Sequence, residues 1–185
     1  SARSYLDVYD RYGLVGPRAV YAHCIHLDDA DRTRMAESGA VMSFCPTSNL
    51  FLGSGLFDRA AARRHGAPVA LGTDVGGGTS FSMLRTLHEA YKIVQMSGRT
   101  LGVLDAFHLA TLGAAQALGL DGEIGNLAPG KAADFAVLDP QATPLLARRF
   151  ARAQDLRERL FVLMMLGDDR AVAATYVLGK PMHRR

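Results

Sequence analysis

The sequence is poor in cysteine, in net charge and in long apolar runs, and each shortage excludes a class of protein. Two cysteines, Cys24 and Cys45, are too few for a disulfide framework, so we expect a reducing compartment, by default the cytoplasm. No apolar run reaches the roughly 18 residues of a membrane span, so no membrane partner is predicted. The formal net charge is only +3. The basic residues are scattered without interleaved aromatic rings, which argues against nucleic-acid binding.

The start of the sequence lacks an initiator methionine and the apolar core of a signal peptide. A helical pattern begins at once, over residues 4–13. We therefore expect the chain to be part of a longer protein. Its 185 residues suit one globular domain or slightly more, and 49% hydrophobic with 21% charged residues is an ordinary soluble composition.

Short apolar runs alternate with helical patterns through the first two thirds of the chain. The runs cover residues 19–24, 40–45 and 69–73, and the helical patterns that follow them cover residues 30–38, 56–64 and 80–96. Phe81 and Leu84 are expected on the buried face of the last of these helices. Residues 47–55 are predicted to be a long loop, and residues 103–118 one or two further helices. The alternation predicts about three βα units of a parallel sheet with right-handed crossovers.

The residue pattern changes after residue 120, where the alternation of apolar runs and helical patterns ends. A turn-rich stretch over 121–131 precedes a predicted strand over 132–138, a helix over 155–166 with Leu156 and Leu163 inward, and a strand over 172–178. We therefore divide the chain into an α/β part, residues 1–119, and a small β-containing part with a packing helix, residues 120–185.

His23 and Asp74 are the candidate functional residues because each ends a predicted parallel strand. Function gathers at the carboxyl ends of such strands, and an imidazole beside a carboxylate suits a metal-activated water. Two other interpretations stay open: Asp74 caps the next helix or a turn, and His23 is a structural histidine with satisfied hydrogen bonds.

Other chemical groups in the sequence favour structural roles. Cys24 and Cys45 lack an evident base that would lower a thiol pKa, so both are interpreted as small buried hydrophobes. The Gly76–Gly78 run lacks the lysine of a phosphate-binding loop, and we expect it to let backbone pass close to a ligand. The remaining histidines are expected in loop, surface or packing positions: His26, His65, His88, His108 and His183.

Four motifs in order resemble the amidohydrolase superfamily, and the resemblance runs over essentially the whole chain. They are residues 22–24 (Ala-His-Cys), 44–50 (Phe-Cys-Pro-Thr-Ser-Asn-Leu), 72–77 (Gly-Thr-Asp-Val-Gly-Gly) and 124–134 (Ile-Gly-Asn through Ala-Ala-Asp). Within the superfamily, residues 73–83 and the late Leu166–Arg170 are most similar to the guanine deaminases.

The resemblance implies a metal-dependent (β/α)₈ TIM barrel with a small β-sandwich. It places Asp74 at the end of the eighth strand, as a metal ligand that also moves protons, and His23 at the end of the sixth, beside the attacking water. The implied metal is zinc, with iron also suitable. The implied reaction is hydrolysis of guanine, a purine, to xanthine and ammonia, a step of purine catabolism, by a homodimeric full-length protein.

Two departures from the superfamily pattern limit this expectation. Phe44 stands where several relatives carry a histidine before the Cys-Pro pair, which speaks against the nucleoside and triazine hydrolases. No His-x-His pair, the other main metal ligands of the family, occurs in the sequence. We therefore expect the chain by itself neither to bind zinc tightly nor to deaminate guanine. The alternatives are a deaminase of another purine or pterin, a non-catalytic half-barrel that binds a partner, and a nucleotide-binding module.

Overall fold

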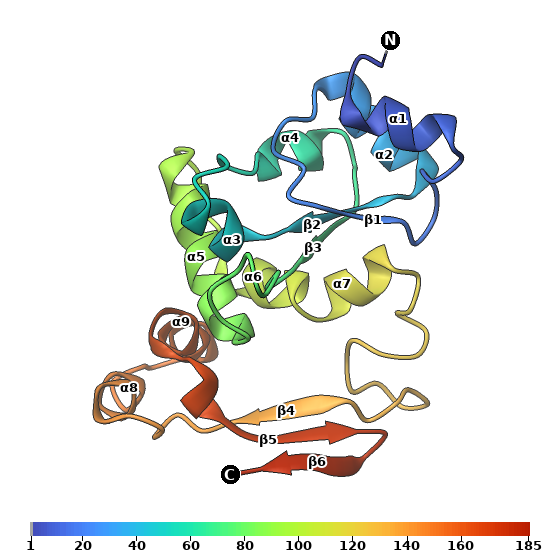
Figure 1. Ribbon diagram of the computed structural model, residues 1–185. Helices are drawn as coiled ribbons and strands as arrows, with labels where there is room; N and C mark the ends of the chain where they lie inside the picture. The colour runs from blue at the N-terminus through green and yellow to red at the C-terminus, as the bar shows by residue number, and fades with distance from the viewer. Residues whose placement is uncertain (1) are drawn as a thin grey trace.

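A three-stranded parallel sheet forms the centre of the first half of the chain. The computed structural model describes residues 2–185. Strands β1 (Val20–Ala22), β2 (Val41–Phe44) and β3 (Val69–Leu71) pair in the order β1-β2-β3 (Figure 1). In the register, Ser43 of β2 lies between Ala22 and Ala70, and both pairings are parallel. The predicted βα units are confirmed, although each strand is shorter than its apolar run.

Helices lie between the strands in the chain and on either side of this strand region. They are α1 (Tyr5–Arg11), α2 (Asp29–Ser38), α3 (Pro46–Phe51), α4 (Arg59–Arg64), α5 (Met83–Met96), α6 (Val103–Leu109) and α7 (Leu112–Ala117). Helix α2 has the ends that its sequence predicts. The Asp28 carboxylate accepts a hydrogen bond from the Asp31 N–H at 2.8 Å, and Gly39 ends the helix in the left-handed region at φ 70°.

Three expectations about this half are wrong. Residues 47–55 are not all loop, because α3 starts at Pro46, whose fixed φ suits the first helical position. Phe81 is not on a buried face, because α5 begins only at Met83, after Ser82, and Phe81 is 85% exposed. The helix at 56–64 likewise begins later, with the Asp58 side chain as its cap.

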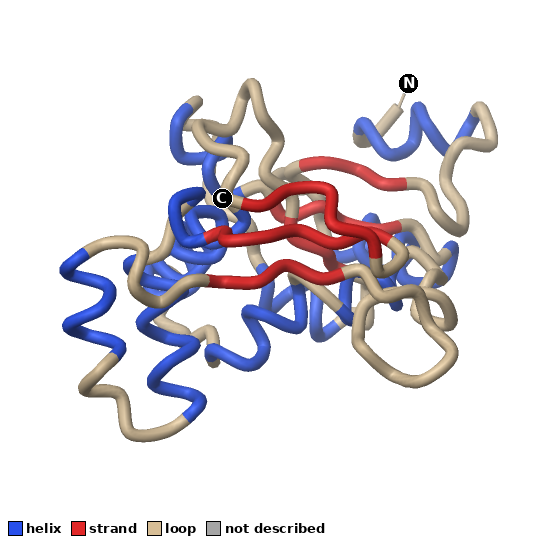
Figure 2. The backbone as a smooth tube through the Cα atoms, turned by 90° about the horizontal axis from the view of Figure 1, so that it is seen from below, coloured by secondary structure: helices blue, strands red, loops and turns tan. Residues whose placement is uncertain are grey.

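A second sheet lies beyond α7 and is antiparallel. Strands β4 (Phe135–Leu138), β5 (Val172–Val177) and β6 (Lys180–Arg184) pair in sequence order, and Figure 2 shows them from below. The Phe135 and Tyr176 rings stack across β4 and β5 at 4.5 Å. Strand β6 was not predicted from the sequence, and all its residues are exposed.

Two helices join β4 to β5, where the sequence predicted one. Helix α8 (Pro144–Phe150) has a Thr143 cap and Pro144 in its first turn, and α9 (Leu156–Leu166) packs against α5. Leu163 of α9 is buried as expected and Met164 is buried beside it, but Leu156 is 66% exposed.

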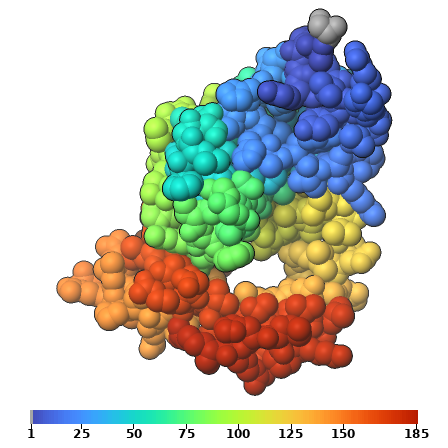
Figure 3. All heavy atoms as spheres, viewed as in Figure 1, coloured from blue at the N-terminus to red at the C-terminus, as the bar shows by residue number. Residues whose placement is uncertain are grey.

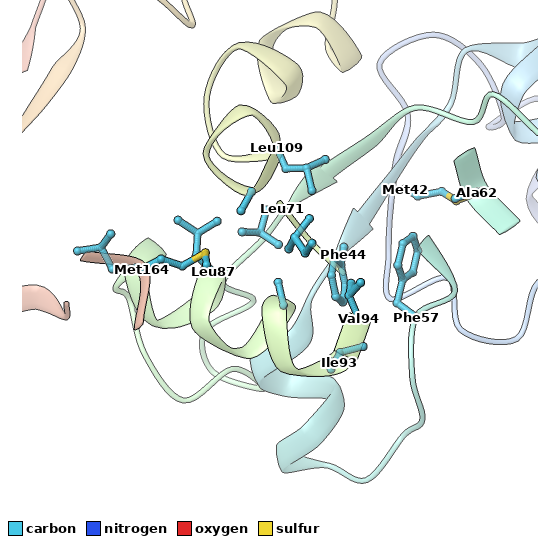
Figure 4. Close-up of a cluster of buried hydrophobic side chains, with 14 of the residues drawn as sticks. Met42, Phe44, Phe57, Ala62, Leu71, Leu87, Ile93, Val94, Leu109 and Met164 are labelled. Carbon is cyan, nitrogen blue, oxygen red and sulfur yellow. The ribbon is translucent and has the colours of Figure 1, made fainter. Parts of the chain in front are cut away.

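One hydrophobic core joins the two parts of the chain. It runs from Phe44 on β2 and Phe57 through Leu87 on α5 to Met164 on α9 (Figure 4). The β4–β6 sheet lies below this core, and Figure 3 shows an opening between it and the α/β part. Across residues 2–185, the helices are all too short or too polar to span a membrane.

Candidate active site

Three side chains from the ends of the three parallel strands meet at one edge of the sheet. His23 directly follows β1, Cys45 directly follows β2, and Asp74 lies three residues after β3. One ligand atom from each side chain lies within 4.8 Å of the other two. The carboxyl ends of parallel strands meet at the same edge, so the chain direction of the sheet produces this cluster.

The two residues selected from the sequence face each other in this cluster. His23 Nε2 lies 3.7 Å from Asp74 Oδ2, and the two side chains are 41% and 34% exposed. Both are therefore open to a water molecule or a small ligand. At 3.7 Å the two atoms are too far apart for a direct hydrogen bond, and a bridging water fits the separation better.

The backbone holds both residues in an uncommon conformation. His23 has φ 69° and Asp74 has φ 50°, the left-handed region that side chains with a Cβ rarely adopt. Such residues persist only where the surrounding structure holds them, and they cluster at functional sites. In this chain both residues with positive φ have side chains that face each other at the shared edge.

Helix α3 contacts the residues of the cluster and their neighbours through consecutive buried polar residues. The Thr47 hydroxyl donates to the Thr73 carbonyl at 3.0 Å, next to Asp74. Asn49, which is 1% exposed, places Oδ1 2.8 Å from His23 Nδ1. This helix therefore contacts the segments that carry both candidate residues. Neither the helix nor the role of Asn49 was predicted from the sequence. The available signal was Pro46 at a helix start, followed by polar residues.

The glycine run after Asp74 lets backbone pass close to backbone. A Cβ on Gly78 would lie 1.8 Å from the Thr73 carbonyl oxygen and 2.8 Å from Thr47 Oγ1. The Gly78 N–H donates to the Asp74 carbonyl. A Cβ on Gly77 would lie 3.3 Å from Asp74 Oδ2. The run therefore folds tightly around Asp74. The atoms that the glycines approach closely belong to Thr73, Thr47 and Asp74 of the same chain.

Cys45 was not predicted to belong to the site. Its thiol is buried, and its Sγ lies 3.3 Å from both Ser43 Oγ and the Ser43 carbonyl. Burial raises the pKa of Cys45, and burial raises that of Cys24 to about 12. Both thiols therefore stay protonated near neutral pH, which agrees with interpreting them as hydrophobes rather than nucleophiles.

The other histidines are not members of this three-residue cluster. His26 belongs to the loop after β1, and His65 ends α4, where its ring contacts Thr33 and Asp29 of α2. His88 is on α5, where burial lowers its pKa. His108 is on α6 and His183 on β6.

The donor types at the site fit a divalent transition metal. A carboxylate and an imidazole are ordinary zinc and iron ligands, and both are accessible here. The protonated Cys45 thiol is the weaker candidate of the three. Asp74 and His23 are thus the residues of this chain that fit such an ion.

Comparison with known proteins identifies the family of the chain. The model of the Amidohydrolase family matches residues 1–182. The chain belongs to the amidohydrolase family. It is 51% identical to guanine deaminase of Escherichia coli (strain K12) over 181 residues, 98% of this chain and 41% of the relative. The solved E. coli guanine deaminase matches with a TM-score of 0.96 over 99% of this chain and 43% of that one.

Two further solved structures that resemble the chain are described with a ligand. Guanine deaminase from C. acetobutylicum, described with guanine in its active site, is 29% identical, with a TM-score of 0.85 over 98% of this chain and 43% of that one. An adenosine deaminase from Xanthomonas campestris with bound zinc is 28% identical, with a TM-score of 0.80 over 97% of this chain and 40% of that one. This amidohydrolase chain thus spans about two fifths of the length of the relatives that it matches.

Proposed function

We propose that this chain is the carboxyl-terminal part of a guanine deaminase and supplies two side chains that act on the attacking water. The observation that carries the proposal is the approach of His23 Nε2 to Asp74 Oδ2, 3.7 Å, at the carboxyl edge of a parallel sheet. The E. coli relative and the guanine-containing neighbour support the substrate.

The proposal includes the architecture of the complete protein. Residues 1–119 contribute βα units to a (β/α)₈ barrel, and residues 120–185 contribute β4, β5 and β6 to a small β-sandwich. The open edge of β1 and the parallel pairing of β1, β2 and β3 support the barrel. The complete protein is a homodimer of the cytoplasm and takes part in purine catabolism.

Asp74 would hold a divalent ion, zinc in preference to iron, through a carboxylate oxygen. When bound, the metal lowers the pKa of a water so that it is nucleophilic near neutral pH. The family's remaining ligands, a His-x-His pair and another histidine, match no residue of this sequence. They come from the rest of the complete protein.

The protein residues then manage the protons of the hydrolysis. His23 Nε2 accepts a hydrogen bond from the water and orients it. An Asp74 carboxylate oxygen accepts the proton that the water loses as its oxygen bonds to the amino-bearing carbon of guanine. Asp74 returns this proton to the departing amine, so guanine and water become xanthine and ammonia.

The test measures ammonia release by the complete protein. With guanine and zinc we expect multiple turnovers, and Asp74→Asn or His23→Gln lowers kcat/KM by about 10²- to 10⁴-fold because each removes a proton-handling group. Asp121→Asn, at an exposed loop position, serves as the matched control and keeps wild-type kinetics. Chelation of the metal abolishes the activity, and zinc restores it.

The substrate is checked in the same assay with adenine, cytosine and 8-oxoguanine. If any of these compounds were turned over faster than guanine, that compound and not guanine would be the substrate. The isolated 185-residue chain is expected to show no multiple-turnover ammonia release. Activity of that chain alone with zinc would contradict the proposed division of the metal ligands.

A further inference from the structure

We propose that Asn49 is a positioning residue that holds the His23 ring with its proton on Nδ1, so that Nε2 presents a lone pair to the site. The inference rests on the proposed function, because it gives His23 the acceptor atom that the water needs. It concerns a buried residue of α3 whose side-chain oxygen contacts the His23 ring at Nδ1, the nitrogen other than the one that faces Asp74.

The position of the Asn49 side chain is restricted independently of its contact with His23. Asn49 is 1% exposed, and both its N–H and its carbonyl make main-chain hydrogen bonds. The Asn49 N–H donates to the Cys45 carbonyl at 3.1 Å, and the Asn49 carbonyl accepts from the Ser54 N–H at 3.0 Å. A buried side chain on a hydrogen-bonded backbone has few rotamers available, so the position of its oxygen is fixed.

The chemistry of the contact determines the tautomer. Asn49 Oδ1 lies 2.8 Å from His23 Nδ1, and an amide oxygen only accepts hydrogen bonds. The contact is therefore a hydrogen bond only when Nδ1 carries the proton. In neutral histidine one nitrogen donates and the other accepts, so Nε2 is left as the acceptor.

The acceptor is directed at Asp74. Nε2 lies 3.7 Å from Asp74 Oδ2, and a lone pair and a carboxylate do not attract each other directly. One water molecule satisfies both, because it can donate one hydrogen to each acceptor. The opposite tautomer would aim an N–H at Asp74 and offer the water a donor instead. Asn49 thus selects which role the ring takes.

The burial of Asn49 is unfavourable unless it serves the site. Its Nδ2 atom is buried and has no hydrogen-bond partner among residues 2–185. A buried amide that leaves its donors unused costs stability, and a leucine of similar size would avoid that cost. The hydrogen bond to His23 is the interaction that a leucine could not replace.

The test compares Asn49→Leu with Asn49→Asp in the complete protein. Leucine has a similar volume but no acceptor, whereas aspartate keeps an oxygen for Nδ1–H. Asn126→Leu, which removes an exposed loop amide, is the matched control. The tautomer is measured by ¹⁵N NMR of the metal-free, histidine-labelled protein, with the His23 signal assigned from His23→Gln. Steady-state kinetics with guanine give kcat and KM separately.

We expect Nδ1–H at His23 in the wild type, Asn49→Asp and Asn126→Leu, and a shift toward Nε2–H in Asn49→Leu. We expect kcat of Asn49→Leu to fall by about 10- to 100-fold with a smaller change in KM, and Asn49→Asp to recover most of it. An Nε2–H tautomer in the wild type would overturn the inference. So would an unchanged tautomer and kcat in Asn49→Leu.

The outcomes separate this inference from the proposed function. Loss of activity in His23→Gln with normal kinetics in Asn49→Leu refutes only the positioning role. An Nδ1–H tautomer that depends on Asn49, in a protein that does not deaminate guanine, refutes only the function. If Asn49→Leu fails to fold, the wild-type tautomer and Asn49→Asp still decide.

Discussion

At the residue scale, the site depends on conformations that the amino acids themselves disfavour. His23 and Asp74 both have positive φ, and the segment after Asp74 passes so close to its own backbone that a Cβ would collide. The glycine run therefore serves the placement of the Asp74 carboxylate. Replacing a single hydrogen there tests whether the carboxylate needs this close packing.

Gly78→Ala is expected to destabilise the protein and to displace Asp74. Its Cβ would lie 1.8 Å from the Thr73 carbonyl oxygen, a backbone atom that cannot move without moving Asp74. We expect a loss at the upper end of about 1–3 kcal/mol in the free energy of unfolding, measured by urea denaturation.

Gly122→Ala is the matched control for Gly78→Ala. A Cβ at Gly122 meets nothing within 4 Å, so its effect should stay within about 0.5 kcal/mol. Equal stability of the two variants would show that the glycine run is not tightly packed in solution.

At the element scale, short helices are held by specific side-chain contacts rather than by length. Helix α1 has only seven residues, too few to be stable alone, and ion pairs tie it to α2. The Arg34 guanidinium bridges Asp7 and Asp10 of α1 at 2.6 and 2.9 Å and the buried Asp31 of α2 at 2.8 Å. Helix α3 is similarly short and depends on its contacts with the strand ends.

Asp7→Asn is expected to make stability less dependent on acid pH. The Arg34 side chain, with the Arg3 N–H and the Ser4 N–H, lowers the pKa of Asp7 from 3.8 to about 2. A carboxyl group whose pKa is lower in the folded state stabilises the fold at any pH above its pKa in the unfolded state. That stabilisation disappears as the pH falls from about 4 to about 2.

The measurement is thermal unfolding of wild type and Asp7→Asn from pH 7 to pH 2. The variant should be less stable at pH 7, and the difference should shrink below pH 4. Glu37→Gln, at an exposed position on α2, controls for loss of a surface charge. A constant difference over the whole range would mean that the ion pairs do not stabilise the α1–α2 contact.

At the scale of the whole molecule, one edge of the parallel sheet is open. Among residues 2–185, β1 pairs only with β2, and Val20 on it is 51% exposed. A groove of about 690 Å³ runs beside it, lined by aromatic side chains that include Tyr5, Tyr9 and Tyr21. Unpaired strand edges next to apolar surface recruit further strands.

The isolated chain is therefore expected to self-associate through β1. Sedimentation velocity at micromolar concentration should show dimers or larger species, and Val20→Lys should shift them toward monomer because a charge at an edge opposes pairing. Val177→Lys, on the central strand β5 and 43% exposed, is the control and should behave as wild type. A monomeric wild-type chain, or equal association of Val20→Lys, would contradict the expectation.

Local patterns were sufficient for the three parallel βα units and for placing His23 and Asp74 near the strand ends. Three apolar runs, with His23, Cys45 and Asp74 at or next to their ends, predicted a parallel sheet, and a parallel sheet places strand ends at one edge. The start of α5, the exposed Leu156 and strand β6 were missed, because exact boundaries and edge pairings depend on neighbours distant in the sequence.

The sequence by itself determined which groups are available: a carboxylate and an imidazole after buried strands, and glycines where no side chain fits. Only the tertiary structure decided how they act together. The 3.7 Å separation of His23 and Asp74, the place of the buried Cys45 beside them, and the contact of Asn49 with the His23 ring all bring together residues that are distant in the sequence. Residue patterns encode local conformation, whereas these distances follow from packing α3 and the glycine run against the strand ends.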